Sequence, residues 1–234
     1  MSSKYRPTFL ILFALLSALS LPHHTFAQQQ TADDFVRNGN AERADGDLDG
    51  AIADYSKAIE LSPKNASPYY NRGSAKVLKG DRDGAIADYT KAIELDPKDT
   101  NAYISRGYAR SDKGDLAGAI ADYSKAIELN PKDASAHISR GMVKNAKGDL
   151  DGAIVDITKG IELSPRNASA YNNRGVVKVK KGDLDGAIAD FTKAVELNPK
   201  DASTYNNRGF ARKKKGDQAG ADADFAQAAK HGGL

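Results

Sequence analysis

Residues 66–99 read ASPYYNRGSAKVLKGDRDGAIADYTKAIELDPKD, and this stretch decides the fold because it recurs along the chain with a period of 34 residues. A Gly-Asp pair marks every copy, at positions 46–47, 80–81, 114–115, 148–149, 182–183 and 216–217. Prolines keep the same spacing from Pro63 to Pro199. Self-similarity at a fixed period of this length indicates a protein built from stacked copies of one supersecondary unit.

Each copy has helical periodicity on both sides of its Gly-Asp pair. After Gly80 the small and apolar positions lie one, three and four residues apart, at Ala85, Ile86, Tyr89, Ala92 and Ile93. Gly80 suits the left-handed residue that ends a helix, and Asp81 can cap the exposed amides of the next one. Pro97 forbids a longer second helix. The unit is therefore predicted to be a helical hairpin.

The pattern closely resembles the tetratricopeptide repeat (TPR). The resemblance rests on Tyr69-x2-Arg72-Gly73 in the first half and on Ala85-x3-Tyr89, Ala92 and Pro97 in the second. It implies an all-α, right-handed superhelical solenoid of six helix-turn-helix units. We expect a signal peptide (1–27), a short linker (28–31) and six repeats, at 32–65, 66–99, 100–133, 134–167, 168–201 and 202–234.

The sixth repeat departs from the others in its second helix. Positions that hold Ile or Leu in earlier repeats hold Asp222, Ala229 and His231. Because no seventh unit would cover them, apolar side chains there would lie in water. We expect the last helix to be a polar cap.

Three sets of charged residues also recur. Where TPR proteins have a large aliphatic residue, this chain has Arg72, Arg106, Arg140, Arg174 and Arg208; where they have an aromatic one, it has Lys76, Arg110, Lys144, Lys178 and Arg212. Aspartates recur at Asp54, Asp88, Asp122, Asp156, Asp190 and Asp224. Paired replacement of this kind favours an Arg-Asp ion pair. Repeat one keeps Asp54 but has Asn38 instead of Arg, so the sequence leaves open whether pairing occurs within a repeat or across a junction.

Residues typical of catalytic and metal sites are scarce. The chain has no cysteine, which excludes disulfides, thiolate metal sites and cysteine nucleophiles. His137 stands where four other repeats have tyrosine and has no second ligand at metal-binding spacing, so we interpret it as a packing residue. The carboxylates recur in register, whereas a catalytic site would be needed once. We expect no enzymatic activity and no metal or cofactor.

The first 27 residues have the layout of a secretory signal peptide. Lys4 and Arg6 precede an apolar run, residues 9–21, and small residues flank Phe26 ahead of a predicted cleavage after Ala27. The run is shorter than the ~20 residues of a membrane-spanning helix, which disfavours a retained anchor. We expect a periplasmic or secreted protein that is not held in a membrane.

Net charge gives no reason to expect a nucleic-acid partner. The chain has a formal net charge of +3, and cleavage would remove the positive charges of Lys4 and Arg6. A nearly neutral protein has no global field to attract a polyanion. The local run of basic residues in 178–181 and 212–215 is consistent either with an acidic partner or with a solvated helix face.

In the TPR family the first helices line a concave groove that receives a peptide or a partner's helix. The resemblance therefore implies a groove at Asn40, Tyr70, Asn71, Tyr108, Met142, Asn172, Asn173, Asn206, Asn207 and Phe210, with Val36, Ser74, Ile104, Ile138 and Val176 beside them. Amides can bond the backbone of an extended chain, and Tyr108, Met142 and Phe210 can anchor apolar side chains. Alternatively, some of these residues only pack neighbouring helices.

These observations predict a non-catalytic, monomeric scaffold that binds a protein or peptide in its groove. The family's carboxylate clamp is not expected, because Asn40 and Asn71 match it but Val36, Asn101 and Ser105 replace its basic residues. The alternative is a groove that binds a small molecule or a cell-wall fragment.

Overall fold

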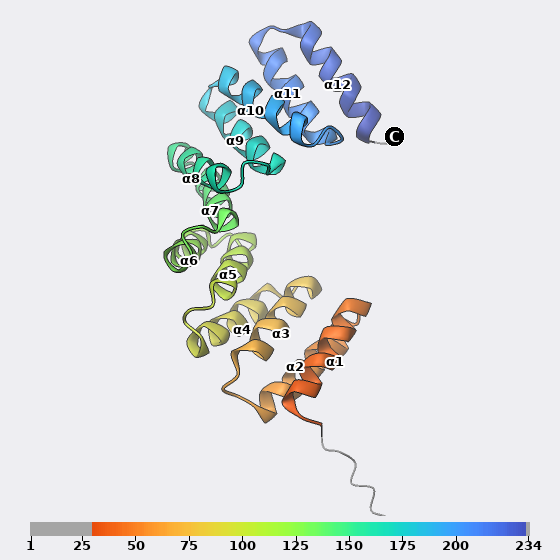
Figure 1. Ribbon diagram of the computed structural model, residues 1–234, viewed down its shortest axis with the longest axis vertical. Coiled ribbons are helices and arrows are strands. Elements are labelled where there is room, and N and C mark those ends of the chain that lie inside the picture. Colours follow the sequence, from red (N-terminus) through yellow and green to blue (C-terminus); the bar gives the residue numbers. More distant parts are fainter. Residues whose placement is uncertain (1–29, 233–234) are drawn as a thin grey trace, which may run out of the picture. The chain divides into compact units, whose positions relative to one another are not determined.

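The computed structural model describes residues 30–232, so the predicted signal peptide and the start of the predicted linker lie outside the described residues. Within them, residues 31–232 form one compact unit. The described residues form twelve α-helices and no strand, and Figure 1 shows them following one another as hairpins. Their bounds are α1 Ala32–Asp45, α2 Leu48–Leu61, α3 Ala66–Lys79, α4 Arg82–Leu95, α5 Thr100–Asp112, α6 Leu116–Leu129, α7 Ala134–Lys147, α8 Leu150–Leu163, α9 Ala168–Lys181, α10 Leu184–Leu197, α11 Ala202–Lys215 and α12 Gln218–Gly232.

The Gly-Asp pair makes the predicted turn between the two helices of a hairpin. Gly80 has a φ of +91°, a left-handed conformation that glycine adopts without a steric penalty. Asp81 then caps α4, because its carboxylate accepts a hydrogen bond of 2.9 Å from the backbone N–H of Gly84. Local sequence therefore fixes both the end of one helix and the start of the next.

Close approach of the paired helices depends on small residues. A Cβ built on Gly73 would lie 2.9 Å from Cε1 of Tyr89, closer than packed atoms tolerate. Ala85 and Ala92, on the facing side of α4, are fully buried. The absence of a side chain at Gly73 therefore lets α3 approach the ring of Tyr89.

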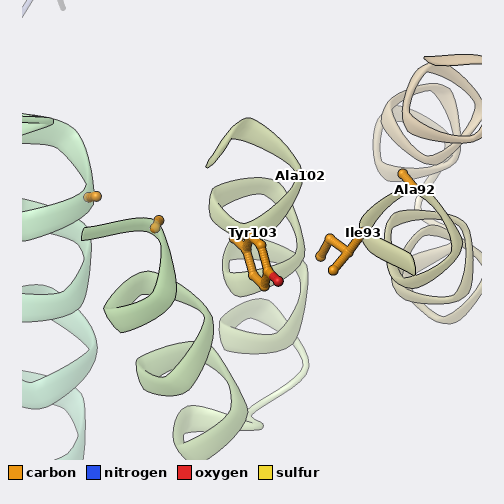
Figure 2. Packing of buried hydrophobic residues seen from close by; sticks show 6 residues of the cluster. Ala92, Ile93, Ala102 and Tyr103 are labelled. Atoms are coloured by element: carbon orange, nitrogen blue, oxygen red, sulfur yellow. The ribbon is translucent and has the colours of Figure 1, made fainter. Parts of the chain in front are cut away.

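Neighbouring hairpins share one another's apolar faces. Ile93 of α4 points toward the ring of Tyr103 on α5, across the junction between the second and third repeats (Figure 2). The same buried cluster extends to Ala126 of α6 and Ala136 of α7. Because one cluster draws residues from three consecutive repeats, no hairpin has a core of its own.

The recurring Arg-Asp pairs form within a repeat. Arg140 donates to both oxygens of Asp156, from Nε at 2.8 Å and from Nη2 at 2.7 Å. Its remaining nitrogen, Nη1, donates to the hydroxyl of Ser124 in the preceding repeat at 3.0 Å. Lys144 contacts the same carboxylate at 2.9 Å. The guanidinium therefore pairs inside its own hairpin and ties that hairpin to the one before it.

This arrangement recurs at every junction. The sets of arginine, aspartate and hydroxyl are Arg72/Asp88/Ser56, Arg106/Asp122/Thr90, Arg140/Asp156/Ser124, Arg174/Asp190/Thr158 and Arg208/Asp224/Thr192. Burial opposes the charge on Asp156, but hydrogen bonds from Arg140 and Lys144 outweigh it and hold the pKa of that carboxyl below its ordinary value. The hydrogen bond to Asp88 likewise raises the pKa of Arg72.

The recurring arginine is missing from the first repeat, and the recurring hydroxyl is missing from the last one. Repeat one has Asn38 in place of arginine, and repeat six has Ala226 in place of the hydroxyl that a following arginine would bond. Repeat one also has Glu42 where the others have a second cation. Burial, together with the charge of Asp54, raises the pKa of Glu42. Asp54 thus lacks the two cations that hold its equivalents.

The last helix behaves as the predicted polar cap at two of its three altered positions. Asp222 and Ala229 are exposed. His231 instead stacks on Tyr205 of α11, with ring centroids 5.8 Å apart and an interplanar angle of 22°. The imidazole therefore covers apolar surface of its own repeat while presenting polar nitrogens.

His137 packs in the interior and is at least as buried as the equivalent Tyr103 and Tyr205, which are each 9% exposed. It is 7% exposed, and its Nε2 lies 3.2 Å from the carbonyl oxygen of Pro131. Its Nδ1 is buried and has no hydrogen-bond partner among the described residues. In four other repeats an arginine lies over the tyrosine ring, as Arg174 does over Tyr171 at 5.7 Å. No contact of this kind is found at His137 among the described residues, so its ring lacks one interaction that the four tyrosines make.

We expect the Arg140–Asp156 pair to show a coupling of about 1–3 kcal/mol in a double-mutant cycle with Arg140→Leu and Asp156→Leu, because each single variant leaves a buried charge without its partner. The measurement is the free energy of unfolding of all four proteins. The exposed pair Lys159–Glu162 is the control, with an expected coupling of about 0.2–0.5 kcal/mol. Additive effects at Arg140 and Asp156 would contradict the pairing.

We expect His137→Tyr to stabilise the protein by about 1 kcal/mol, or roughly 2–4 °C in Tm, because the buried unpaired nitrogen is removed and a ring is restored beneath Arg140. Thermal unfolding followed by circular dichroism checks this. The reverse change, Tyr171→His, is expected to lower Tm by a similar amount. A lower Tm for His137→Tyr would show that the site is shaped for imidazole.

Candidate peptide-binding groove

The first helices of the hairpins lie against one another. Among the described helices, α1 contacts α3, α3 contacts α5, and this continues to α9 and α11, whereas no second helix contacts another second helix. Helices that approach more closely lie on the inner side of a bend. The face made by the odd-numbered helices is therefore the inner face of the array, where the sequence predicts the groove.

One hollow on this face, called the larger hollow, lies between α9 and α11 and has a volume of about 490 Å³. Its floor is apolar, and lysines stand at its rim. The lining residues are Val176, Val179, Lys180, Phe191, Asn207, Phe210, Ala211, Lys213 and Lys214.

A smaller hollow, about 260 Å³, centres on α5. It is lined by Val77, Tyr89, Ile104, Ser105, Tyr108, Tyr123 and Ser139, and is therefore rich in hydroxyl groups. Burial raises the pKa of Tyr123 to about 12. Its phenol stays protonated at neutral pH, so it serves as a neutral hydrogen-bonding group.

Three predicted groove residues line these hollows. Tyr108 borders the smaller one, and Asn207 and Phe210 border the larger one. Tyr108 is 54% exposed and Phe210 is 64% exposed, although both are large and apolar. They occupy the same position of their repeats, three repeats apart, and Met142 and Val176 hold that position in the two repeats between them. Phe210 rests edge-on against Phe225 of α12, with ring centroids 5.2 Å apart.

Other predicted residues hold the scaffold together. Asn40 accepts a hydrogen bond of 2.8 Å from the Tyr55 hydroxyl, inside the first repeat. Tyr70 lies 3.3 Å from the hydroxyl of Ser105 on α5 and packs against the ring of Tyr89. The contacts of Tyr70 match the alternative given above, in which it packs a neighbouring first helix, whereas Asn40 bonds within its own hairpin and is exposed.

Asn172 bonds within the scaffold and also positions a residue that lines the larger hollow. Its Oδ1 accepts a bond of 2.9 Å from Nδ2 of Asn207, which joins α9 to α11 beneath the larger hollow. Thr204 also donates to it, at 3.3 Å. Asn172 therefore orients Asn207, which is the residue of the pair that reaches the hollow.

The remaining predicted residues line neither hollow. Met142 packs against the buried cluster of α8 and α9 that contains Ile157. Asn206 is exposed, and Asn71 and Asn173 are half-buried. They remain candidates for contact with a ligand longer than either hollow.

The sequence indicated the basic runs 178–181 and 212–215 but did not separate from their neighbours the three lysines that line the larger hollow, Lys180, Lys213 and Lys214. They lie inside the basic runs, whose other members are held by acids of the scaffold. Those ion pairs are Lys178–Asp190, Lys181–Asp151, Arg212–Asp224 and Lys215–Asp185. The signal in the sequence was the absence of a recurring acidic partner for the first three.

Metal-binding clusters and membrane-spanning helices are both absent from residues 30–232. No group of three or more histidine, aspartate or glutamate side chains is placed to hold a metal ion there. Within the same residues, no helix is both long enough and apolar enough to cross a membrane.

Comparison with known proteins agrees with the repeat architecture. A family model described as TPR repeat matches residues 39–80, 73–112, 107–145, 141–182 and 177–216. No curated protein matches the chain.

Several solved structures are similar. The MamA protein is 31% identical, with a TM-score of 0.67, over 74% of this chain and 94% of that one. A TPR protein from Parabacteroides merdae has the same fold at 24% identity and a TM-score of 0.69, over 88% of this chain and 81% of that one. YrrB, described as a TPR protein with an unusual peptide-binding site, also shares the fold, at 24% identity and a TM-score of 0.62, over 76% of this chain and 91% of that one.

TPR proteins bind protein or peptide partners and are generally non-catalytic scaffolds. The family match spans most of the described residues, and the packing of successive helical hairpins agrees with it. This chain belongs to the tetratricopeptide repeat family.

Proposed function

We propose that this protein is a non-catalytic scaffold that binds a peptide or a partner's helix along the face formed by its odd-numbered helices. The observation that carries the proposal is the exposure of Tyr108 and Phe210 at the edges of the two hollows. Exposed aromatic side chains beside a cavity are typical anchors of protein interfaces.

The placement of the other exposed apolar side chains supports this choice. Among the described residues, the remaining large ones are Leu61, Leu78 and Val155, which belong to three separate helices and line neither hollow. Scattered single residues of this kind are ordinary on a protein surface. Tyr108 and Phe210 differ because each is joined to a concave, partly apolar surface.

The test is photo-crosslinking in the cells that make the protein, with a photoreactive amino acid in place of Asn173 between the two hollows. We expect a captured polypeptide that is lost with Tyr108→Ser and Phe210→Ser, because these changes remove the apolar anchors. Val155→Ser is the matched control, since Val155 is 67% exposed on the second helix α8. The control is expected to keep the capture.

Other outcomes discriminate between functions. Capture of a carbohydrate or of a small molecule would replace the proposal with a ligand-binding module. Capture that persists with Tyr108→Ser and Phe210→Ser but is lost with Val155→Ser would move the binding surface to the second helices.

We also propose that the protein acts outside the cytoplasm, because residues 1–27 have the composition of a secretory signal. The exported protein is expected to begin at Gln28, which mass spectrometry of the periplasmic and secreted fractions checks. Leu16→Arg interrupts the apolar run and is expected to keep the full-length chain inside the cell. An exported chain that still begins at Met1 would contradict cleavage, and one confined to the cytoplasm would contradict export.

A further inference from the structure

The larger hollow combines an apolar floor with an uncompensated positive rim. Val176, Phe191 and Phe210 provide apolar surface, while Lys180 and Lys214 provide charge at its edge. All of the residues that line it are apolar, amide or basic, and none is acidic. An anionic group placed here would therefore meet lysines without meeting a carboxylate of the lining.

The fold does not require these lysines. Lys180 and Lys214 occupy one repeat position, and the same position holds Leu78 in α3, Asp112 in α5 and Ala146 in α7. A residue type that the hairpin needed would recur, as the arginines and aspartates of the junctions do. The lysines appear only in the last two repeats, on the two helices that border the hollow.

The neighbouring cations differ from these lysines because they form ion pairs with aspartates. Lys181 pairs with Asp151 and Lys215 with Asp185, each across a repeat junction. Lys180 donates to the amide oxygen of Asn145 at 3.0 Å, a neutral acceptor that leaves its charge unbalanced. Lys213 and Lys214 are exposed and form no ion pair within residues 30–232.

A polar group is also available for a peptide backbone. Nδ2 of Asn207 is occupied by its bond to Asn172, which holds the side chain in place at the edge of the hollow. The carbonyl oxygen of the same amide is left to accept a hydrogen bond from a backbone N–H.

We propose that the hollow between α9 and α11 binds an acidic peptide segment that inserts one large apolar side chain beside Phe210 and sets its carboxylates against Lys180, Lys213 and Lys214. This inference rests on the proposed function and names the chemistry of the partner. The charge on the rim selects an acidic segment, and the apolar floor selects a bulky side chain within it. The volume of about 490 Å³ accommodates a large side chain and part of the backbone on either side.

The probe is a fluorescein-labelled peptide, Asp-Glu-Asp-Phe-Asp-Glu-Asp, whose binding to the purified protein is followed by fluorescence anisotropy. Two matched peptides replace the acids with Asn and Gln, or the Phe with Ala. We expect each replacement to weaken binding at least tenfold, and we expect higher salt to weaken binding of the acidic peptide only, since salt screens the lysines.

The test variant carries Lys180→Gln, Lys213→Gln and Lys214→Gln together, and we expect it to bind the acidic peptide about tenfold more weakly and with less dependence on salt. The control variant carries Lys125→Gln, Lys159→Gln and Lys193→Gln. These lysines lie on α6, α8 and α10, so the control loses the same charge away from the hollow. Circular dichroism verifies that both variants are folded. Phe210→Ala is expected to weaken binding about tenfold without changing its salt dependence.

Equal affinity for the acidic and amide peptides, or equal weakening by both triple variants, would overturn the inference. If crosslinking in cells still depended on Phe210 in that case, the groove would remain a protein-binding site and only the acidic partner would be wrong. If neither Phe210 nor the lysines affected either assay, both proposals would fail. Binding of phosphatidylglycerol vesicles in place of the peptide would assign the lysines to a lipid surface and would also overturn the inference.

Discussion

Each hairpin of this protein leaves an apolar face that only the next hairpin covers, and the rest of the structure depends on this constraint. Ile93 of one repeat packs on Tyr103 of the next, and their cluster runs on into a third repeat. Apolar burial is thus a property of neighbours rather than of a single unit. This explains how a chain without cysteine, and with small alanines and glycines at many of its helix contacts, forms a continuous core.

The arginines at the junctions between repeats add directional hydrogen bonds to that packing. Each one makes a two-point contact with an aspartate of its own hairpin and uses its third nitrogen for a hydroxyl of the preceding hairpin. A buried ion pair often contributes little net stability compared with apolar residues of the same size, but it is costly to break. We infer that the arginines mainly fix the angle at which hairpins stack. If one hairpin shifted along the next, the guanidinium would lose its hydrogen-bond acceptors and its N–H donors would be left unsatisfied.

Residues that recur in every repeat build the scaffold, whereas residues that vary between repeats form the candidate site. Positions that repeat in all copies, such as Gly73 and Asp88, build the hairpins, whereas Tyr108, Phe210 and the lysines of the larger hollow occur where other repeats have different residue types. The scaffold therefore leaves the inner face of each first helix free to vary. The hollow between α9 and α11 lies where aromatic, amide and basic variants coincide on neighbouring helices.

The sequence by itself determined the hairpins, their caps and the order in which they stack, because helical periodicity, Gly80 and Asp81 act over a few residues. It also identified the recurring arginines and aspartates. Only the tertiary structure decided that they pair within a repeat, because residues sixteen positions apart meet through helix packing. The same holds for the groove. Asn40 and Tyr70 looked equivalent to Phe210 in sequence, yet their side chains contact hydroxyl groups fifteen and thirty-five residues away. Which basic residues of the runs 178–181 and 212–215 form ion pairs within residues 30–232 was likewise decided by helix packing, both within a repeat and between repeats.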